Sequence, residues 1–173
     1  MSFIKKQGAG TWISIITVIV GIVALAIYGA ATGAGMGLEI ASGSQPFYEA
    51  SRPEDSAMLS TVVTCGVIAL VCLAVGIVLG QFKSDSIVGK VCAILSGALR
   101  IVAPALLLLV LLNFAYGSLT GLGWTFFSNE ELSIAAEAIA VGKQVIAGLV
   151  FFAIAAIAAI VAAFFGVVRK EQN

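Results

Sequence analysis

The sequence alternates long apolar stretches with short polar segments that carry nearly all of its charges. Four stretches hold no charge or a single one: 7–38, 56–82, 91–118 and 144–168. A transmembrane helix needs about 20 consecutive apolar residues to cross the hydrocarbon core of a bilayer. The pattern therefore predicts an all-α membrane four-helix bundle, a single transmembrane domain over 1–173 with spans at about 11–35, 57–81, 91–118 and 143–168.

Composition supports a lipid environment. The chain is 61% hydrophobic and 10% charged, and its mean hydropathy is +1.13. Soluble domains average about 45–50% apolar and 25% charged residues. A soluble fold of this size has too little interior to bury so much apolar surface, so we expect the lipid bilayer to cover the outer faces of the helices.

Two local signals predict helix starts. The segment Pro53–Asp55, a proline followed by two acids, suits the first turn of a helix. The segment Ser128–Glu131 fits a capping box and predicts a helix start near Asn129. A single helix from there to the end of the fourth span would exceed the bilayer thickness. We therefore expect a short external interfacial helix over about 130–141, with a break or bend near Gly142.

The basic residues predict the orientation. Six of them flank the predicted spans on one side, and two lie in the opposite loops: Lys5, Lys6, Lys83, Lys90, Arg169 and Lys170 against Arg52 and Lys143. Cytoplasmic loops carry the excess of lysine and arginine. We predict a multi-pass plasma-membrane protein with both termini in the cytoplasm. The first apolar stretch exceeds the 7–15 residues of a signal-peptide core, so we expect it to be a retained span.

The sequence offers little for catalysis. Histidine is absent and the net charge is zero, so the chain lacks the commonest metal ligand and the commonest general base, and it has no basic surface for nucleic acid. The cysteines at 65, 72 and 92 all lie in apolar stretches. The first two are seven residues apart on one predicted helix, too far for a disulfide. We predict that the protein is not an enzyme, holds no metal or cofactor, and binds no nucleic acid.

Arg100 is the one ionisable residue inside a predicted span. Counted from Lys90 along a helix, it lies roughly 15 Å deep. Pro104 cannot donate to the Arg100 carbonyl, so a kink with a free acceptor is expected beside the cation. One interpretation is a contact with an anion, lipid or partner; the other is an arginine that snorkels to the headgroups and sets the depth of the span. Asn113 is expected to bond a neighbouring helix.

Small residues recur at four-residue spacing. The candidate helix-packing face comprises Gly29, Gly33, Gly37, Gly76 and Gly80. Small-x-x-x-small faces let membrane helices approach closely. Two interpretations follow: packing inside the four-helix bundle, which we favour for most of these glycines, and docking of another membrane protein.

Aromatic residues end the third span, and Tyr116, Trp124, Phe126 and Phe127 are expected at the outer membrane interface. The motifs Gly121–Trp124, Phe127–Asn129, Ala163–Phe165 and Arg169-Lys170 resemble those of uncharacterised four-span integral membrane proteins of Gram-positive gut bacteria. The resemblance lies mainly in the last third of the chain. It implies the same four-span plan and a bacterial plasma membrane, and it implies no activity.

These observations favour an accessory or scaffold subunit that binds another membrane protein. The alternative is a component of a small transporter or channel, with self-association of the chain and a pore between protomers guarded by Arg100 and Pro104. An intramembrane enzyme is disfavoured, because the spans hold no carboxylate cluster and no nucleophile beside a base.

Overall fold

The computed structural model describes residues 7–35, 53–82, 86–127 and 135–168, without the side chains of residues 33–35, 53–59, 124, 135 and 137. Its helices are α2 (Ala9–Gly35), α3 (Pro53–Leu79), α4 (Ile87–Phe127) and α5 (Ala135–Phe164). All four are long and apolar enough to cross a membrane. The predicted all-α plan with four spans is thus confirmed, and α3 begins at Pro53 as its sequence predicts. The predicted capping box at 128–131 lies outside the described residues.

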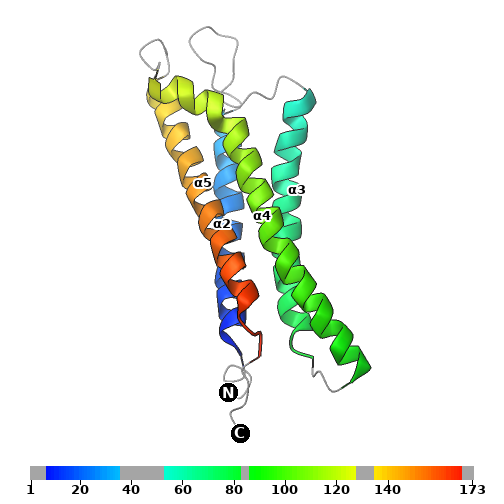
Figure 1. The fold of residues 1–173 in the computed structure, drawn as a ribbon. Helices are drawn as coiled ribbons and strands as arrows, with labels where there is room; N and C mark the ends of the chain where they lie inside the picture. The colour runs from blue at the N-terminus through cyan, green and yellow to red at the C-terminus, as the bar shows by residue number, and fades with distance from the viewer. Residues whose placement is uncertain (1–6, 36–52, 83–85, 128–134, 169–173) are drawn as a thin grey trace.

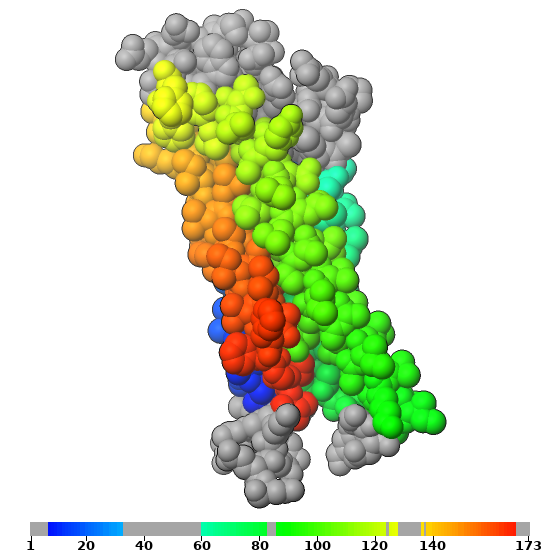
Figure 2. All heavy atoms as spheres, viewed as in Figure 1, coloured from blue at the N-terminus to red at the C-terminus, as the bar shows by residue number. Residues whose placement is uncertain are grey.

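The helices form an elongated bundle (Figure 1). Helix α2 packs most extensively against α5, and α3 against α4. The contacts between α4 and α5 and the fewer contacts between α2 and α3 join these two pairs. Figure 2 shows α4 and α5 side by side along one face of the bundle. The outer faces are apolar: Ile19, Val71, Ile101 and Ile157 are all more than half exposed, as expected for helices that lipid surrounds.

An aromatic stack fills the middle of the bundle. Tyr28 of α2 meets Phe114 of α4 edge-to-face at a centroid distance of 4.8 Å. Phe114 in turn meets Phe152 of α5 at 6.1 Å. Gly148 makes room for this stack, because a Cβ there would lie 2.8 Å from the Phe114 ring. The centre of the bundle is therefore a closed apolar core.

Glycines also set the contact between α2 and α3. The side chain of Leu70 fills the space beside Gly21, and the side chain of Leu25 fills the space beside Gly66. Each of the two helices thus contributes one glycine, and a leucine of the other helix packs against it. In lipid the hydrophobic effect gives no drive for helices to associate, so close van der Waals packing of this kind must hold them together.

Helix α4 is longer than the hydrocarbon core of a bilayer is thick. Its 41 residues span roughly 60 Å at 1.5 Å per residue, about twice the hydrocarbon core. Its last turns bend across the end of the bundle toward the start of α5 (Figure 1). There Phe126 packs on Gly142, where an added Cβ would lie 3.1 Å from the ring.

The break predicted near Gly142 is wrong. Helix α5 runs without interruption through this residue from Ala135 to Phe164. Gly142 allows α4 to cross closely, and it does not end α5. The structure therefore gives no support for a separate interfacial helix ahead of the fourth span.

The two described ends of the chain meet at one end of the bundle. Gln7 pairs with Val168 in an isolated antiparallel bridge. This adjacency requires an even number of crossings, as four helices provide.

Candidate functional site

Arg100 projects from α4 onto the carboxyl end of α5. Its side chain is buried, with 7% of its surface exposed. Nη2 donates to the carbonyl oxygen of Ala162 and, at 2.8 Å, to that of Phe165. The last carbonyls of a helix lack partners within the helix and form the negative end of its dipole. Arg100 therefore caps α5 from a neighbouring helix.

Two glycines form the walls around this arginine. A Cβ added at Gly10 of α2 would lie 2.7 Å from Arg100 Nη2, and one added at Gly76 of α3 would lie 3.1 Å from Arg100 Cγ. One helical turn before Arg100, the Ser96 hydroxyl donates to the Gly76 carbonyl at 2.6 Å. All four helices thus contribute to the surroundings of the guanidinium.

The Arg100 guanidinium is only partly satisfied. Nε is buried and has no hydrogen-bond partner among the described residues. Both contacts that the structure gives to Nη2 are to backbone carbonyls. Because the guanidinium lies against the last turn of α5 and the second residue of α2, it lies near the end of the bundle.

A clasp ties the start of α2 to the segment that follows α5. We use this term for the pairing of residues 7–11 with 166–168. Gly8 N donates to Val167 O at 2.7 Å, and Gly10 N donates to Gly166 O at 3.1 Å. The Thr11 hydroxyl donates to the same Val167 oxygen at 2.8 Å. The first amide groups of α2 are therefore capped by the carboxyl-terminal segment, while Arg100 caps α5.

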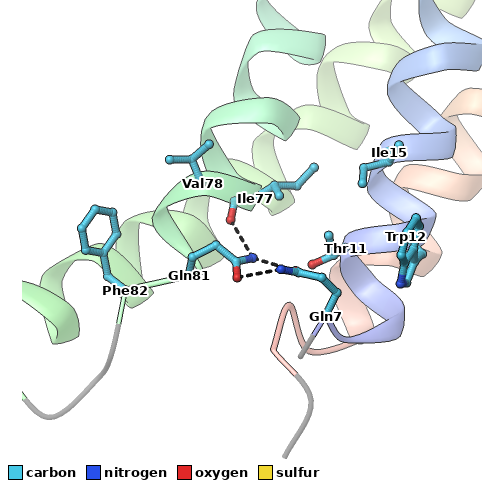
Figure 3. A pocket seen from close by; sticks show the side chains of 8 residues that line it. All are labelled: Gln7, Thr11, Trp12, Ile15, Ile77, Val78, Gln81 and Phe82. Carbon is cyan, nitrogen blue, oxygen red and sulfur yellow. Dashed lines mark hydrogen bonds between the residues drawn. The ribbon is translucent and has the colours of Figure 1, made fainter. Parts of the chain in front are cut away.

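An amide pair lies next to the clasp. Gln7 Nε2 donates to Gln81 Oε1 at 3.1 Å, and Gln81 Nε2 donates to Gln7 Oε1 at 3.0 Å. Gln81 Nε2 also donates to the Ile77 carbonyl at 3.3 Å. This pair bridges the start of α2 and the turn after α3, where an apolar groove opens between the two helices (Figure 3).

Pro104 and Asn113 do not join this cluster. Pro104 is buried one turn after Arg100, and α4 continues through it. Asn113 Nδ2 donates to the Leu109 carbonyl in its own helix at 2.8 Å. The hydrogen bond that the structure gives to Asn113 thus lies within α4, and the expected bond to a neighbouring helix stays a prediction.

The glycines of the predicted packing face separate into two groups. Gly76 packs on Arg100, and a Cβ at Gly80 would lie 2.9 Å from Val167, so both serve contacts inside the bundle. Gly29 is exposed, and no atom of the described residues lies within 4 Å of where its Cβ would be. The surroundings of Gly33 and Gly37 lie outside the described residues.

The predicted interfacial aromatics lie toward the end of α4. Tyr116 is 70% exposed and Phe127 90% exposed, while Phe126 packs partly on Gly142. The side chain of Trp124 lies outside the described part. The three cysteines are unpaired, and the described residues hold no group of three or more histidine, cysteine, aspartate or glutamate side chains that would bind a metal.

Sequence reasoning singled out Arg100 and Gly76 but missed their partners. Gly10, Thr11, Ser96 and the amide pair lie at the ends of apolar stretches, where small and polar residues are common. In the sequence, Gly8 and Gly10 stand out only because they directly precede the first predicted span. No spacing in the sequence links them to residues 166–168. No protein-family model matches the chain, and neither a curated protein nor a solved structure is detectably similar to it.

Proposed function

We propose that the protein is a non-catalytic, multi-span membrane protein that acts as an accessory or scaffold subunit. In this proposal it binds another membrane protein through the outer face of α2 around Gly29. Its six flanking basic residues hold both termini in the cytoplasm, and the resemblance of its last third favours a bacterial plasma membrane.

The open space at Gly29 carries the proposal. Ala26, Gly29 and Ala30 are exposed on one side of α2, and within the described part of the chain nothing lies within 4 Å of the position of a Gly29 Cβ. A glycine inside a helix costs about 1 kcal/mol relative to alanine. Contact with lipid chains does not offset this cost. A partner helix can offset it, because glycine permits the close approach that van der Waals packing between helices requires.

The placement of the polar residues weighs against the transporter or channel alternative. The aromatic stack of Tyr28, Phe114 and Phe152 closes the centre of the bundle. Arg100 and Pro104, the residues expected to guard a path between protomers, are both buried. Neither side chain reaches the outer surface on which a second protomer would dock.

Purification in mild detergent tests the proposal. We expect a membrane protein to co-elute with the full chain at a fixed ratio, and Gly29→Leu to reduce this ratio several-fold by blocking close approach. Gly97→Leu is the matched control, because Gly97 is also exposed with open space at its Cβ but lies on α4. Elution of the wild-type chain without a partner, or an equal effect of both substitutions, would contradict the docking role.

A ring of identical protomers with a hydrated axis would instead support the transporter or channel. The topology is tested separately by reporters fused to the two ends of the chain. We expect both reporters to signal from the cytoplasm, and signals from opposite compartments would refute the four-span orientation.

A further inference from the structure

An apolar groove of about 450 Å³ lies between the start of α2 and the end of α3. Trp12 and Ile15 form one wall, and Val78 and Phe82 form the other (Figure 3). Trp12 is 46% exposed, Val78 61% and Phe82 53%, so both walls reach the outer surface of the bundle. Because α2 and α3 are apolar enough to cross a membrane, the groove opens toward the hydrocarbon chains of the surrounding lipid.

The amide pair of Gln7 and Gln81 lies at one end of the groove, and both side chains are partly exposed. Both N–H groups of Gln81 Nε2 are used, by Gln7 Oε1 and the Ile77 carbonyl. Gln7 Nε2 donates one N–H to Gln81 Oε1, and its second N–H has no acceptor among the residues that the structure describes. Each amide oxygen accepts one bond within the pair and keeps a second lone pair. This end of the groove therefore offers one donor and two acceptors to a ligand.

The described lining of the groove holds no charged side chain. A phosphate or an ammonium group placed at the amide pair would lose its hydration without gaining an ion-pair partner, and this desolvation is costly. An uncharged head with a hydroxyl and a carbonyl avoids the cost, because the hydroxyl donates to an amide oxygen and the carbonyl accepts the free N–H of Gln7. The groove thus suits a long apolar chain that ends in a small, uncharged group with one donor and one acceptor.

We propose that this groove binds an uncharged glycerolipid with a free hydroxyl, a diacylglycerol. One acyl chain lies between the two apolar walls, and its ester carbonyl accepts the free N–H of Gln7. The glycerol hydroxyl donates to an amide oxygen of the pair. A phospholipid fits this end less well, because its headgroup replaces that hydroxyl with an ionic phosphate.

Fluorescence of Trp12 provides a direct test. A Trp124→Phe background leaves Trp12 as the only tryptophan, since the chain has two. The full chain is reconstituted in phosphatidylcholine vesicles that contain diacylglycerol, phosphatidylcholine or phosphatidylglycerol with identical brominated acyl chains, each at the same low mole fraction. We expect diacylglycerol to quench Trp12 about threefold more strongly than phosphatidylcholine, the ratio that corresponds to one average side-chain hydrogen bond inside a membrane protein.

Two substitutions separate a bound lipid from lipid that merely surrounds the bundle. Val78→Phe fills the groove, and Gln7→Leu removes the free donor while it leaves the apolar walls intact. Each is expected to abolish the preference for diacylglycerol, and Gln7→Leu keeps the test decisive if Val78→Phe does not fold. The controls are Ile19→Phe on the outer face of α2 and Gln144→Leu on an exposed face of α5, which should retain the preference.

Three outcomes would overturn the proposal. Equal quenching of the wild type by diacylglycerol and phosphatidylcholine would show that the groove holds any acyl chain. Stronger quenching by phosphatidylglycerol than by diacylglycerol would show that charge selects the lipid. Both substitutions keep Trp12 at the same depth in the bilayer, so a preference that persists in them would reflect the depth of diacylglycerol in the membrane and not a bound molecule.

Discussion

The middle of the bundle and its Arg100 end are held together by different means. In the middle, Tyr28, Phe114 and Phe152 pack ring against ring with a glycine making room for them. At the Arg100 end, the four helices are joined by a guanidinium, the backbone clasp and an amide pair. Lipid competes well for apolar contacts and poorly for hydrogen bonds. Close packing of apolar side chains therefore stabilises the middle of the bundle, while hydrogen bonds stabilise its Arg100 end.

The largest expected effect comes from the apolar middle. Phe114→Ala removes the central ring of the stack and leaves a cavity that α5 cannot fill, which should lower the free energy of unfolding by about 3–5 kcal/mol. Unfolding with SDS in mixed micelles measures this. Leu112→Ala on the 68% exposed side of α4 is the control and should change stability by less than about 0.5 kcal/mol. A cost below that control would show that the stack adds no stability.

Arg100→Leu tests the polar end. Two hydrogen bonds from a charged donor are lost. The Phe165 carbonyl loses its Arg100 donor, while the Ala162 carbonyl still accepts from the Phe165 amide at 3.2 Å. We expect a cost of about 2–3 kcal/mol. Hydrogen exchange of the amides of residues 8–11 and 163–168 should accelerate, while the amides around Phe114 should stay protected. Arg100→Lys keeps the charge and should have an intermediate effect. A leucine variant that is as stable as the wild type would exclude the capping role.

Gly10→Ala tests how closely α2 approaches this arginine. The added methyl group would lie 2.7 Å from Arg100 Nη2 and would also contact the Phe165 carbonyl. We expect a loss of about 2 kcal/mol from overpacking. Gly97→Ala has open space and should instead be neutral or slightly stabilising, since alanine favours helix. Equal stability of the two variants in the same SDS titration would argue against the close contact.

Gln81→Leu should have the smallest effect. It removes the amide pair between α2 and α3, and a side-chain hydrogen bond inside a membrane protein contributes about 0.6 kcal/mol on average. Gln144→Leu on an exposed face of α5 is the control. A loss in Gln81→Leu that matches the Arg100→Leu loss would mean that the amide pair contributes as much stability to this end as the guanidinium does.

The sequence is sufficient for the number of helices and insufficient for the contacts between them. Long uncharged stretches identify transmembrane segments directly, because charge is excluded from the hydrocarbon core. Pro53 indicates a helix start, because its fixed backbone angle suits the first turn. Which face of a helix meets which neighbour depends on rotation and tilt, which one apolar stretch leaves open. Arg100 was therefore found as an unusual residue, but its partners on α5 lie 62 and 65 residues away.

Gly142 illustrates the same limit. A glycine between an acidic segment and an apolar one fits a helix break equally well as a close crossing of two helices. The structure distinguishes them through Phe126, which packs on Gly142 from α4. No local pattern around Gly142 refers to that distant ring, so the sequence alone favoured the break.

The clasp has a consequence for biosynthesis. Thr11 and Val167 are 156 residues apart, so the first helix leaves the ribosome long before the residues that cap it exist. At typical elongation rates of about 5–20 residues per second, its start waits about 10–30 s for those residues. A nascent chain interrupted within α5 therefore presents uncapped amide groups at the start of α2. A membrane quality-control protease could distinguish it from a finished chain by these uncapped groups.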